Sequence, residues 1–367
     1  MRVLNIMSRF NVGGTSQWLY QLSQGLDERQ ITNVLLIGDC PNGELEDSRL
    51  EILTHKKISG LGPKASIIQT IRAFFELRKE IERFKPDIVN THTSKAGVLG
   101  RIATKTVRTN AKVAHTYHGH VLNGYFNPVI ENLIKGIEIF LSFFTDLFLV
   151  SGEQVLLDLR KAHIIRNKPA KTIWPAVPDI QVNNGKLIRK EMGIPNDAIV
   201  FGWLGRKVPI KRVDRIIEMA ISRPEYYFII AGDGESIEKT YSSYFVNREI
   251  TNLKEEGYTS PSVIWAVADI CLLTSDNEAM PISPIEAAIC SKPTLATDAG
   301  STREVVIDGK TGFVSTSDSA RLLSLADILA SSSELRDKMG KEARNFAITK
   351  FSPGASIERQ IYCYRSV

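Results

Sequence analysis

Short apolar runs recur along the chain and alternate with segments of helical periodicity. Apolar runs bounded by turn-forming residues are typical of central strands in parallel sheets, where both faces of each strand are buried. In the first half of the chain these runs are residues 3–7, 33–37, 88–92, 112–117 and 147–150, and in the second half they are residues 199–204, 227–231, 270–274 and 294–297. Helical segments such as residues 212–221 separate them. The alternation predicts two α/β domains, each with a doubly wound parallel sheet.

The stretch Trp-Pro-Ala-Val-Pro-Asp at residues 174–179 lies between the two sets of predicted strands. Its prolines disfavour helix and strand, so we expect the hinge between the domains here. The predicted first domain is residues 1–177 and the predicted second domain is residues 178–350. A helical pattern closes the chain, and we expect residues 351–367 to form a helix that packs back on the first domain.

The composition is that of an ordinary globular protein, with 367 residues, 43% of them hydrophobic and 24% charged. A net charge of +5 suits phosphorylated ligands, but without a polybasic tract it excludes a nucleic-acid footprint. The four cysteines form no C-x-x-C pair, which favours reduced thiols in a reducing cytosol. The sequence shows no signal peptide and no apolar stretch long enough to span a bilayer, so we expect a cytoplasmic protein.

Glu278 and Glu286 lie on either side of the break between the predicted strand at residues 270–274 and a helix that starts near Pro284. Proline fits the first turn of a helix because its missing amide would be unpaired there. One carboxylate is therefore expected in the loop and the other on the helix, where carboxylate oxygens can accept bonds from ribose or sugar hydroxyls. Two glutamates on an ordinary surface helix are the competing interpretation.

A basic loop, residues 205–212, follows the first predicted strand of the second domain. Arg206 and Lys211 in this loop can clamp a diphosphate together, because arginine offers a planar fork and lysine a point charge. Such a pair can neutralise a departing diphosphate without a metal ion. A solvated basic turn is the alternative interpretation.

Gly13 and Gly14 follow the first predicted strand and precede a predicted helix. Glycines at this place let the backbone approach a ligand at the start of the helix. A tight turn without a ligand explains the pair equally well.

Four of the six histidines fall within residues 92–120. We interpret one of these histidines as a hydrogen-bond donor to a substrate, and we expect structural roles for His115 and His163. His118 and His120 have a spacing that also suits zinc, but no third ligand follows at a recognisable spacing. The chain has no Asp-x-Asp pair, the arrangement that commonly holds a divalent ion on a nucleoside diphosphate, so we expect no metal.

Taken in chain order, these motifs resemble those of the retaining family 4 glycosyltransferases. The matching positions are Gly13 and Gly14, His118, Gly205 and Arg206 with Lys211, residues 231–234, Glu278 with Glu286, and residues 298–301 and 308–313. The resemblance spans nearly the whole chain, and residues 91–97 and 115–121 are similar to a bacterial branch that builds surface polysaccharides from UDP-sugars. It implies a GT-B fold, in which two Rossmann-like doubly wound parallel-sheet domains face a central cleft, with the acceptor in the first and the donor in the second.

The resemblance also implies a role for each matching residue. His118, Arg206, Lys211 and Glu278 would be the catalytic residues: Arg206 and Lys211 would hold the diphosphate, Glu278 the donor sugar, and His118 a sugar hydroxyl near the reacting carbon. Donor binding would also involve Gly13, Gly14, Glu286 on the ribose, and the stretch that contains Met280 and Ile282. The reaction would retain the anomeric configuration without a carboxylate nucleophile, because the leaving phosphate can take the proton of the acceptor.

The chain departs from the family's pattern after the first glutamate, where Ala-Met-Pro at residues 279–281 replaces Gly-Phe-Gly. Pro281 has no amide, so one expected bond to the donor is absent. Residues 175–179 replace the usual Asn-Gly-Val-Asp of the linker, and residues 250–257, expected to contact the nucleobase, lack the familiar apolar-glycine form. The identity of the base therefore does not follow from the sequence.

The implied function is transfer of a hexose or N-acetylhexosamine, without metal or cofactor, from a UDP-sugar such as UDP-glucose to a lipid-linked or glycan acceptor in polysaccharide biosynthesis. The expected partners are this donor and this acceptor, with no nucleic acid. A further expectation is peripheral contact with the anionic inner face of the membrane through residues 129–144. Two alternatives stay open: an epimerase or hydrolase that acts on a nucleotide-sugar, and a noncatalytic sugar-nucleotide binding protein.

Overall fold

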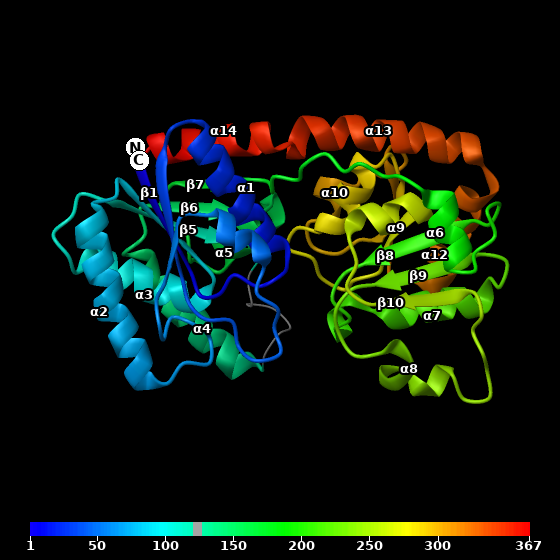
Figure 1. The fold of residues 1–367 in the computed structure, drawn as a ribbon, viewed down its shortest axis with the longest axis horizontal. Coiled ribbons are helices and arrows are strands. Elements are labelled where there is room, and N and C mark those ends of the chain that lie inside the picture. The colour runs from blue at the N-terminus through cyan, green and yellow to red at the C-terminus, as the bar shows by residue number, and fades with distance from the viewer. Residues whose placement is uncertain (120–126) are drawn as a thin grey trace. The chain divides into compact units, whose positions relative to one another are not determined.

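The computed structural model describes residues 1–119 and 127–367 (Figure 1). The chain divides into two compact units, Met1–Ala176 with Pro353–Val367, and Val177–Ser352. In each unit helices cover both faces of one parallel sheet. The predicted fold class, two doubly wound parallel α/β sheets, is confirmed.

The first unit has a seven-stranded sheet in the order β3-β2-β1-β4-β5-β6-β7. Its strands are β1 (Arg2–Met7), β2 (Thr32–Ile37), β3 (His55–Lys57), β4 (Ile88–His92), β5 (Lys112–Tyr117), β6 (Leu147–Val150) and β7 (Ala170–Thr172). Its helices are α1 (Gly14–Glu28), α2 (Ile67–Phe84), α3 (Ser94–Lys105), α4 (Pro128–Ser142), α5 (Glu153–Lys161) and α14 (Pro353–Arg365).

Two apolar cores hold this unit together, one on each face of its sheet. On one face the β1 side chains Val3 and Met7 pack with α1 and with α14. On the other face Leu4 and Ile6 of β1 pack with α2 and α3. The alternation along β1 is the two-residue periodicity of a strand buried on both faces. The approach of α14 to α1 is close, because a Cβ at Gly25 would meet the side chain of Ile357.

The second unit has a six-stranded sheet in the order β10-β9-β8-β11-β12-β13. Its strands are β8 (Val200–Leu204), β9 (Tyr227–Ala231), β10 (Leu253–Glu256), β11 (Ile270–Leu273), β12 (Thr294–Thr297) and β13 (Gly312–Ser315). Its helices are α6 (Gly185–Glu191), α7 (Val213–Ser222), α8 (Ile237–Thr240), α9 (Pro261–Val267), α10 (Ile282–Ile289), α11 (Thr302–Val305), α12 (Ser319–Ser331) and α13 (Ser333–Phe351). Helices α7 and α12 cover one face, and α9 and α10 cover the other.

Every strand predicted from an apolar run is present, and the helix predicted at residues 212–221 is α7. The prediction missed β3, β7, β10 and β13, because these short strands carry polar side chains or a glycine. Residues 173–184 contain neither helix nor strand, as predicted for the linker. Phe351 ends α13 and Pro353 begins α14, so residues 351–367 contain the last residue of one helix and the whole of another.

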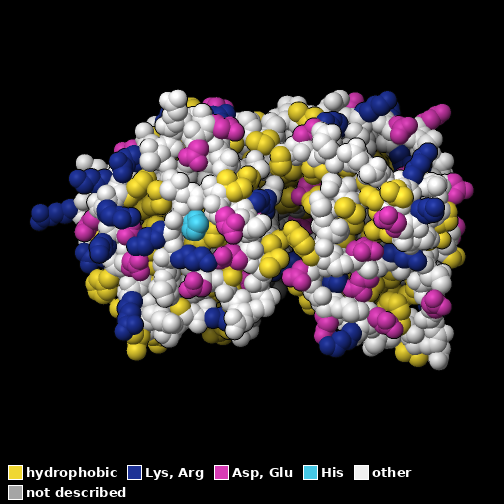
Figure 2. Space-filling view, in the orientation of Figure 1, with side chains coloured by type: hydrophobic (Ala, Val, Ile, Leu, Met, Phe, Trp, Pro, Cys, Tyr) yellow, Lys and Arg dark blue, Asp and Glu magenta, His cyan; other side chains and the backbone are white. Residues whose placement is uncertain are grey.

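Strand order reverses once in each sheet, between β1 and β4 in the first unit and between β8 and β11 in the second. At such a switch point the loops that follow the two strands run to opposite faces and leave a crevice, which is where open parallel sheets bind ligands. Ligand sites are therefore expected at the two switch points, where the carboxyl ends of the strands and the loops that follow them form what we call the switch-point edge of each sheet. Within the described ranges, no helix is long and apolar enough to cross a membrane. Figure 2 shows basic and acidic side chains interspersed over the visible face of each unit.

Candidate functional site

Two loops meet at the switch point of the second unit: residues 205–212 after β8, and residues 274–281 after β11. Thr274 Oγ1 donates to the Lys211 carbonyl at 2.9 Å, and the Asp276 amide donates to the Ile210 carbonyl at 2.9 Å. These bonds connect residues more than sixty positions apart in the chain. They bring the predicted basic loop and the first predicted glutamate to one place.

Lys211 and Glu278 form an ion pair at this edge, with Lys211 Nζ 2.6 Å from Glu278 Oε1. Ser275 Oγ donates to the same carboxylate oxygen at 2.6 Å. Glu278 is only 7% exposed, so its charge needs these partners. The ion pair with Glu278 in turn orients the ammonium group of Lys211 before any ligand binds. A diphosphate that bound here would share or displace a partner that Lys211 already has.

The backbone beneath Glu278 is held by a glycine that cannot be replaced without strain. The Ser301 amide donates to the Glu278 carbonyl at 2.9 Å. Gly300 has φ +54°, and a Cβ there would lie 2.0 Å from the Glu278 carbonyl oxygen. Both the left-handed backbone and the close approach require glycine. The loop after β12 therefore fixes the position of the loop that carries Glu278.

The cations of the basic loop differ in their partners. Lys207 Nζ bonds to Glu255 Oε1 at 2.5 Å, and Arg212 pairs with Asp214 and Asp276. Arg206 is exposed, and no hydrogen bond or ion pair of its side chain occurs within residues 1–119 and 127–367. The loop thus places the two predicted clamp residues together on one segment, Lys211 held by Glu278 and Arg206 open to solvent.

Helix α10 follows the Glu278 loop and carries the second glutamate, as predicted. Pro281 precedes the helix and Pro284 lies in its first turn. Glu286 lies on the second turn and is partly buried. Met280 and Ile282 stand on either side of Pro281, at the end of the helix where free amides and the helix dipole favour an anion. The second unit therefore collects Arg206, Lys211, Glu278, Met280, Ile282 and Glu286 along two adjacent loops and one helix.

At the switch point of the first unit, Gly13 and Gly14 begin α1 and are exposed. The Gly13 carbonyl accepts the first helical bond, from the Gln17 amide at 3.0 Å. No side chain caps this end of α1. A Cβ at Gly13 would meet no atom of residues 1–119 and 127–367 within 4 Å, so these residues leave open space next to the amides that begin the helix.

His118 follows β5 and lies against α1 in the same unit. Its ring meets the Trp18 ring edge-on with centroids 4.8 Å apart, and it stacks on His92 with centroids 5.2 Å apart. Burial lowers the pKa of His118 to about 3. The imidazole is therefore neutral at physiological pH, and it can donate or accept a hydrogen bond but offers no charge.

A network of buried polar side chains lies beneath His118. His92 Nδ1 is 2.9 Å from His118 Nε2. The other ring nitrogen, His92 Nε2, is 3.0 Å from Asn90 Nδ2 and 3.2 Å from Asn5 Oδ1. Thr116 Oγ1 donates to Asn90 Oδ1 at 2.9 Å. Burial also holds the pKa of His92 well below its usual value, so the network is uncharged.

His92, Asn5 and Asn90 also belong to this edge, and none of them was predicted as a site residue. A signal was available: each is a polar residue in a short apolar run, and Asn90 and His92 are two positions apart, on the same face of β4. Polar side chains in a strand buried on both faces need partners, and they find them across the sheet, where Asn5 is opposite Asn90 and His92 is opposite Thr116.

His115 and His163 lie outside the hydrogen-bond network of His118. His115 is buried, and its Nδ1 is 2.7 Å from Thr91 Oγ1, a structural contact as expected. His163 is exposed, and His120 lies outside the described residues. Within those residues, no group of three histidine, cysteine or acidic side chains is arranged to hold a metal ion.

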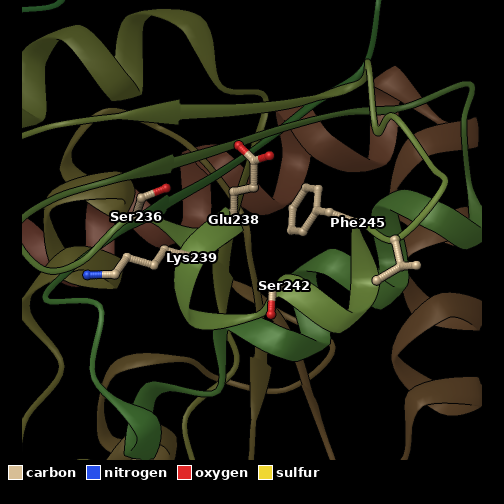
Figure 3. A pocket seen from close by; sticks show the side chains of 6 residues that line it. Ser236, Glu238, Lys239, Ser242 and Phe245 are labelled. Carbon is tan, nitrogen blue, oxygen red and sulfur yellow. The ribbon is translucent and has the colours of Figure 1, made fainter.

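A pocket in the second unit does not contain the predicted residues. It has a volume of about 430 Å³ and lies in the second unit around α8 (Figure 3). Its lining residues are Ser236, Glu238, Lys239, Ser242, Phe245 and Val246. In Figure 3 Lys239 points away from Phe245, and the side chains do not converge on one point. The candidate site therefore rests on the switch-point loops and not on this pocket.

Two doubly wound parallel sheets are the architecture of the GT-B class of glycosyltransferases. Solved structures of this class align over the whole chain. Anabaena HepE in complex with UDP and glucose has 18% identity and a TM-score of 0.84 over 100% of both chains. Sucrose-phosphate synthase from Thermosynechococcus elongatus has 16% identity and a TM-score of 0.85 over 100% of this chain and 99% of that one.

The family follows from the sequence itself. The model described as Glycosyltransferase Family 4 matches residues 12–179, and the model described as Glycosyl transferases group 1 matches residues 185–346. The chain belongs to the family 4 glycosyltransferases, and it is a glycosyltransferase of GT-B type. The resemblance drawn from the motifs is confirmed.

The chain matches most of the length of two curated relatives. UDP-Gal:alpha-D-GlcNAc-diphosphoundecaprenol alpha-1,3-galactosyltransferase of Escherichia coli is 26% identical over 307 residues, 78% of this chain and 77% of that protein. Putative glycosyltransferase EpsD of Bacillus subtilis is 26% identical over 317 residues, 81% of each chain.

Proposed function

We propose that the protein transfers a hexose or N-acetylhexosamine from a UDP-sugar to a lipid-linked or glycan acceptor in polysaccharide biosynthesis, with retention of the anomeric configuration and without a metal. The observation that carries the proposal is the Lys211–Glu278 pair at the switch point of the second sheet, beside the exposed Arg206. The names of the relatives support the substrate class, because the Escherichia coli enzyme uses UDP-Gal and a diphosphoundecaprenol-linked sugar.

In this proposal the second unit binds the donor. Arg206 and Lys211 hold the diphosphate, and the amides near Met280 and Ile282, at the start of α10, bind its oxygens. Glu286 accepts bonds from the ribose hydroxyls and Glu278 from the donor sugar. When the bond between sugar and diphosphate breaks, Lys211 and Arg206 stabilise the charge that develops on the leaving group.

The first unit binds the acceptor. His118 is neutral and hydrogen-bonds a sugar hydroxyl near the reacting carbon. Gly13 and Gly14 let the phosphate of the donor approach the start of α1. The leaving phosphate takes the proton of the acceptor hydroxyl as that oxygen attacks from the same face, so no protein nucleophile is required, unlike in a retaining glycosidase.

The test is calorimetric titration of the protein with UDP, GDP and ADP in the presence of EDTA. We expect UDP to bind with a Kd on the order of 1 μM, about 8 kcal/mol, and Glu286→Ala to weaken it tenfold or more. Glu191→Ala is the matched control, because Glu191 is an exposed glutamate on α6 of the same unit. Tighter binding of GDP or ADP would contradict the UDP assignment, and binding that requires a divalent ion would contradict metal independence.

Turnover separates the alternatives. A transferase releases UDP from a UDP-sugar faster when a lipid-linked or glycan acceptor is added. Free sugar or an epimer formed at the same rate without acceptor would identify the hydrolase or epimerase. UDP binding with no turnover in extracts of polysaccharide precursors would identify a noncatalytic binding protein.

We also propose that α4 brings the first unit to an anionic membrane surface. One side of α4 is anchored inward, where Glu138 pairs with the fully buried Arg101 at 2.9 Å. The other side exposes apolar side chains, among them Leu133 at 63% and Phe140 at 55%. Arg166 lies over the ring of the exposed Phe143 at 5.3 Å. An apolar stripe beside basic side chains suits the interface of an anionic bilayer.

Co-sedimentation with vesicles tests this contact. We expect binding to vesicles of anionic phospholipid but not to neutral phosphatidylcholine, and loss of most binding in Leu133→Ser/Phe140→Ser. Leu187→Ser is the control, since Leu187 is equally exposed on α6 of the other unit. No binding of the unaltered protein to anionic vesicles would remove the proposal and leave the transferase assignment untouched.

A further inference from the structure

One hydrogen bond joins the stacked rings of His92 and His118 in the first unit. His92 Nδ1 and His118 Nε2 are 2.9 Å apart, and a hydrogen bond between two imidazole nitrogens requires a proton on one and a lone pair on the other. Since burial keeps both rings neutral, each ring carries one N–H. The nitrogen of His92 that holds the proton therefore decides which nitrogen of His118 holds its own.

The surroundings of His92 Nε2 favour one arrangement. Asn90 Nδ2, a donor, is 3.0 Å away, and Asn5 Oδ1, an acceptor, is 3.2 Å away. The Asn90 amide is oriented by Thr116, whose hydroxyl donates to its oxygen at 2.9 Å, and by Tyr364, whose hydroxyl accepts from its nitrogen at 2.8 Å. With the nitrogen of Asn90 turned toward the ring at the shorter distance, His92 Nε2 is the acceptor. Its proton is then on Nδ1, directed at His118.

We propose that His92 is a positioning residue: it accepts from Asn90 at Nε2, donates from Nδ1 to His118 Nε2, and so fixes the tautomer in which His118 Nδ1 carries the proton offered to a sugar oxygen. The inference rests on the proposed role of His118 in the transfer reaction. It assigns a function to a residue that touches neither substrate.

The state of His118 Nδ1 supports this assignment. The atom is buried and has no hydrogen-bond partner among residues 1–119 and 127–367. A buried donor without a partner costs about 1–3 kcal/mol, which a bound hydroxyl oxygen would recover. The stacked ring of His92 and the edge of Trp18 prevent His118 from turning to use another partner.

The network also extends to the end of the chain. Tyr364 on α14 accepts from Asn90 and also from Gln360 Nε2 at 2.7 Å. Residues 274 positions apart in the sequence thus cooperate to orient one amide. Helix α14 contributes to the candidate site through this chain of bonds, without contributing a side chain to the ligand.

The first test reads the tautomer directly and does not depend on activity. In protein labelled with ¹⁵N-histidine, long-range ¹H–¹⁵N spectra distinguish protonated from unprotonated ring nitrogens, and His118→Gln assigns the His118 signals. We expect His118 to be protonated at Nδ1 and His92 at Nδ1. His92→Asn, whose amide takes the place of Nδ1, keeps the His118 tautomer, whereas His92→Leu gives a mixture. His118 protonated at Nε2 in the unaltered protein would overturn the proposal.

The second test is kinetic. We expect His92→Leu to lower kcat by roughly 10-fold to 100-fold, the scale of a misplaced catalytic group. UDP affinity should be unchanged, because the residues proposed to hold the diphosphate and the ribose lie in the other unit. His92→Asn should recover most of the loss, and Tyr364→Phe should lie between them. His163→Asn is the control for a histidine removed from the surface. A kcat that does not respond to His92→Leu, in a protein with the expected tautomer, would refute the positioning role while leaving the transferase function standing.

Discussion

The two switch-point edges are built on the same topology but with opposite chemistry. The edge of the first unit is neutral: two imidazoles, two carboxamides and a threonine are joined by hydrogen bonds. The edge of the second unit is ionic, with Lys211 and Glu278 in contact and Arg206 exposed beside them. Neutral donors and acceptors match hydroxyl groups, and cations match a diphosphate. The same strand reversal therefore presents neutral groups in one unit and charged groups in the other, because the residues at the strand ends and in the loops differ.

Lys211→Met is the strongest way to break the ionic edge. We expect kcat to fall on the order of 100-fold to 1000-fold, as when one group that stabilises developing charge is removed. Glu278 would then be buried without its cation, so stability is followed by urea unfolding of the same variant. Lys341→Met, an exposed lysine on α13, is the control.

The double variant Lys211→Met/Glu278→Gln separates the two roles of the lysine. It restores neutrality to the buried pair, and we expect stability to return while turnover stays low. If turnover also returns, Lys211 serves only to neutralise Glu278, and the distinction between the edges loses its functional meaning.

Gly300→Ala tests the backbone that carries the ionic edge. A Cβ would lie 2.0 Å from the Glu278 carbonyl oxygen, and we expect about 1–3 kcal/mol lower unfolding free energy than for Gly309→Ala. Gly309 is a matched control, because it also has positive φ but its Cβ would meet nothing within 4 Å. Equal losses in urea denaturation would show that the close approach to Glu278 relaxes at no cost.

The neutral edge is expected to respond to acid. The unfolded chain binds a proton on a histidine near pH 6.5, whereas burial lowers the pKa of His118 to about 3. Between these values the unfolded state binds more protons, so the unfolding free energy falls as the pH falls. His118→Gln removes one such proton and should flatten this dependence by a slope that grows to about 1.4 kcal/mol per pH unit as the pH falls below 6.5. Urea unfolding from pH 7 to pH 5 measures the slope, with His163→Asn as control; an unchanged slope would mean that His118 is protonated in the native protein.

The smallest effect is expected for Arg206→Gln. The side chain is exposed, so we expect the unfolding free energy to change by less than about 0.5 kcal/mol. UDP affinity should fall severalfold, about 1 kcal/mol for a solvated charge pair. Calorimetry at low and high salt checks this, because the loss should shrink as salt screens the charge. An unchanged UDP affinity would leave Lys211 as the sole cation of the clamp.

Much of the fold could be predicted from the sequence, because buried parallel strands are apolar runs. Residues 147–150 and 270–274 predict β6 and β11 in this way. Strand β3 (His55–Lys57) and strand β10 (Leu253–Glu256) could not be recognised, since edge strands have one neighbour and tolerate charged side chains. Residues 250–257, interpreted as a nucleobase loop, contain β10.

The candidate site was predictable as a set of residues but not as a set of contacts. Sequence placed Glu278 in a loop and Glu286 on a helix, and this is what the structure has. Nothing in the sequence indicated that Lys211 and Glu278, assigned to different parts of the donor, touch each other. The pairing depends on two loops meeting at a strand reversal, which is a property of the sheet order. The roles proposed for these residues remain to be tested by the variants above.

The return of the chain to the first unit sets an order for biosynthesis. Residues 1–176 leave the ribosome first, but α14, which fills one face of their sheet, belongs to residues 353–367. The second unit is continuous and can fold as soon as Ser352 has emerged, whereas the first must wait with part of its apolar surface uncovered. The first unit is therefore synthesised first but completes its fold last. A nascent chain that stops before Pro353 leaves the apolar surface of this unit exposed to chaperones.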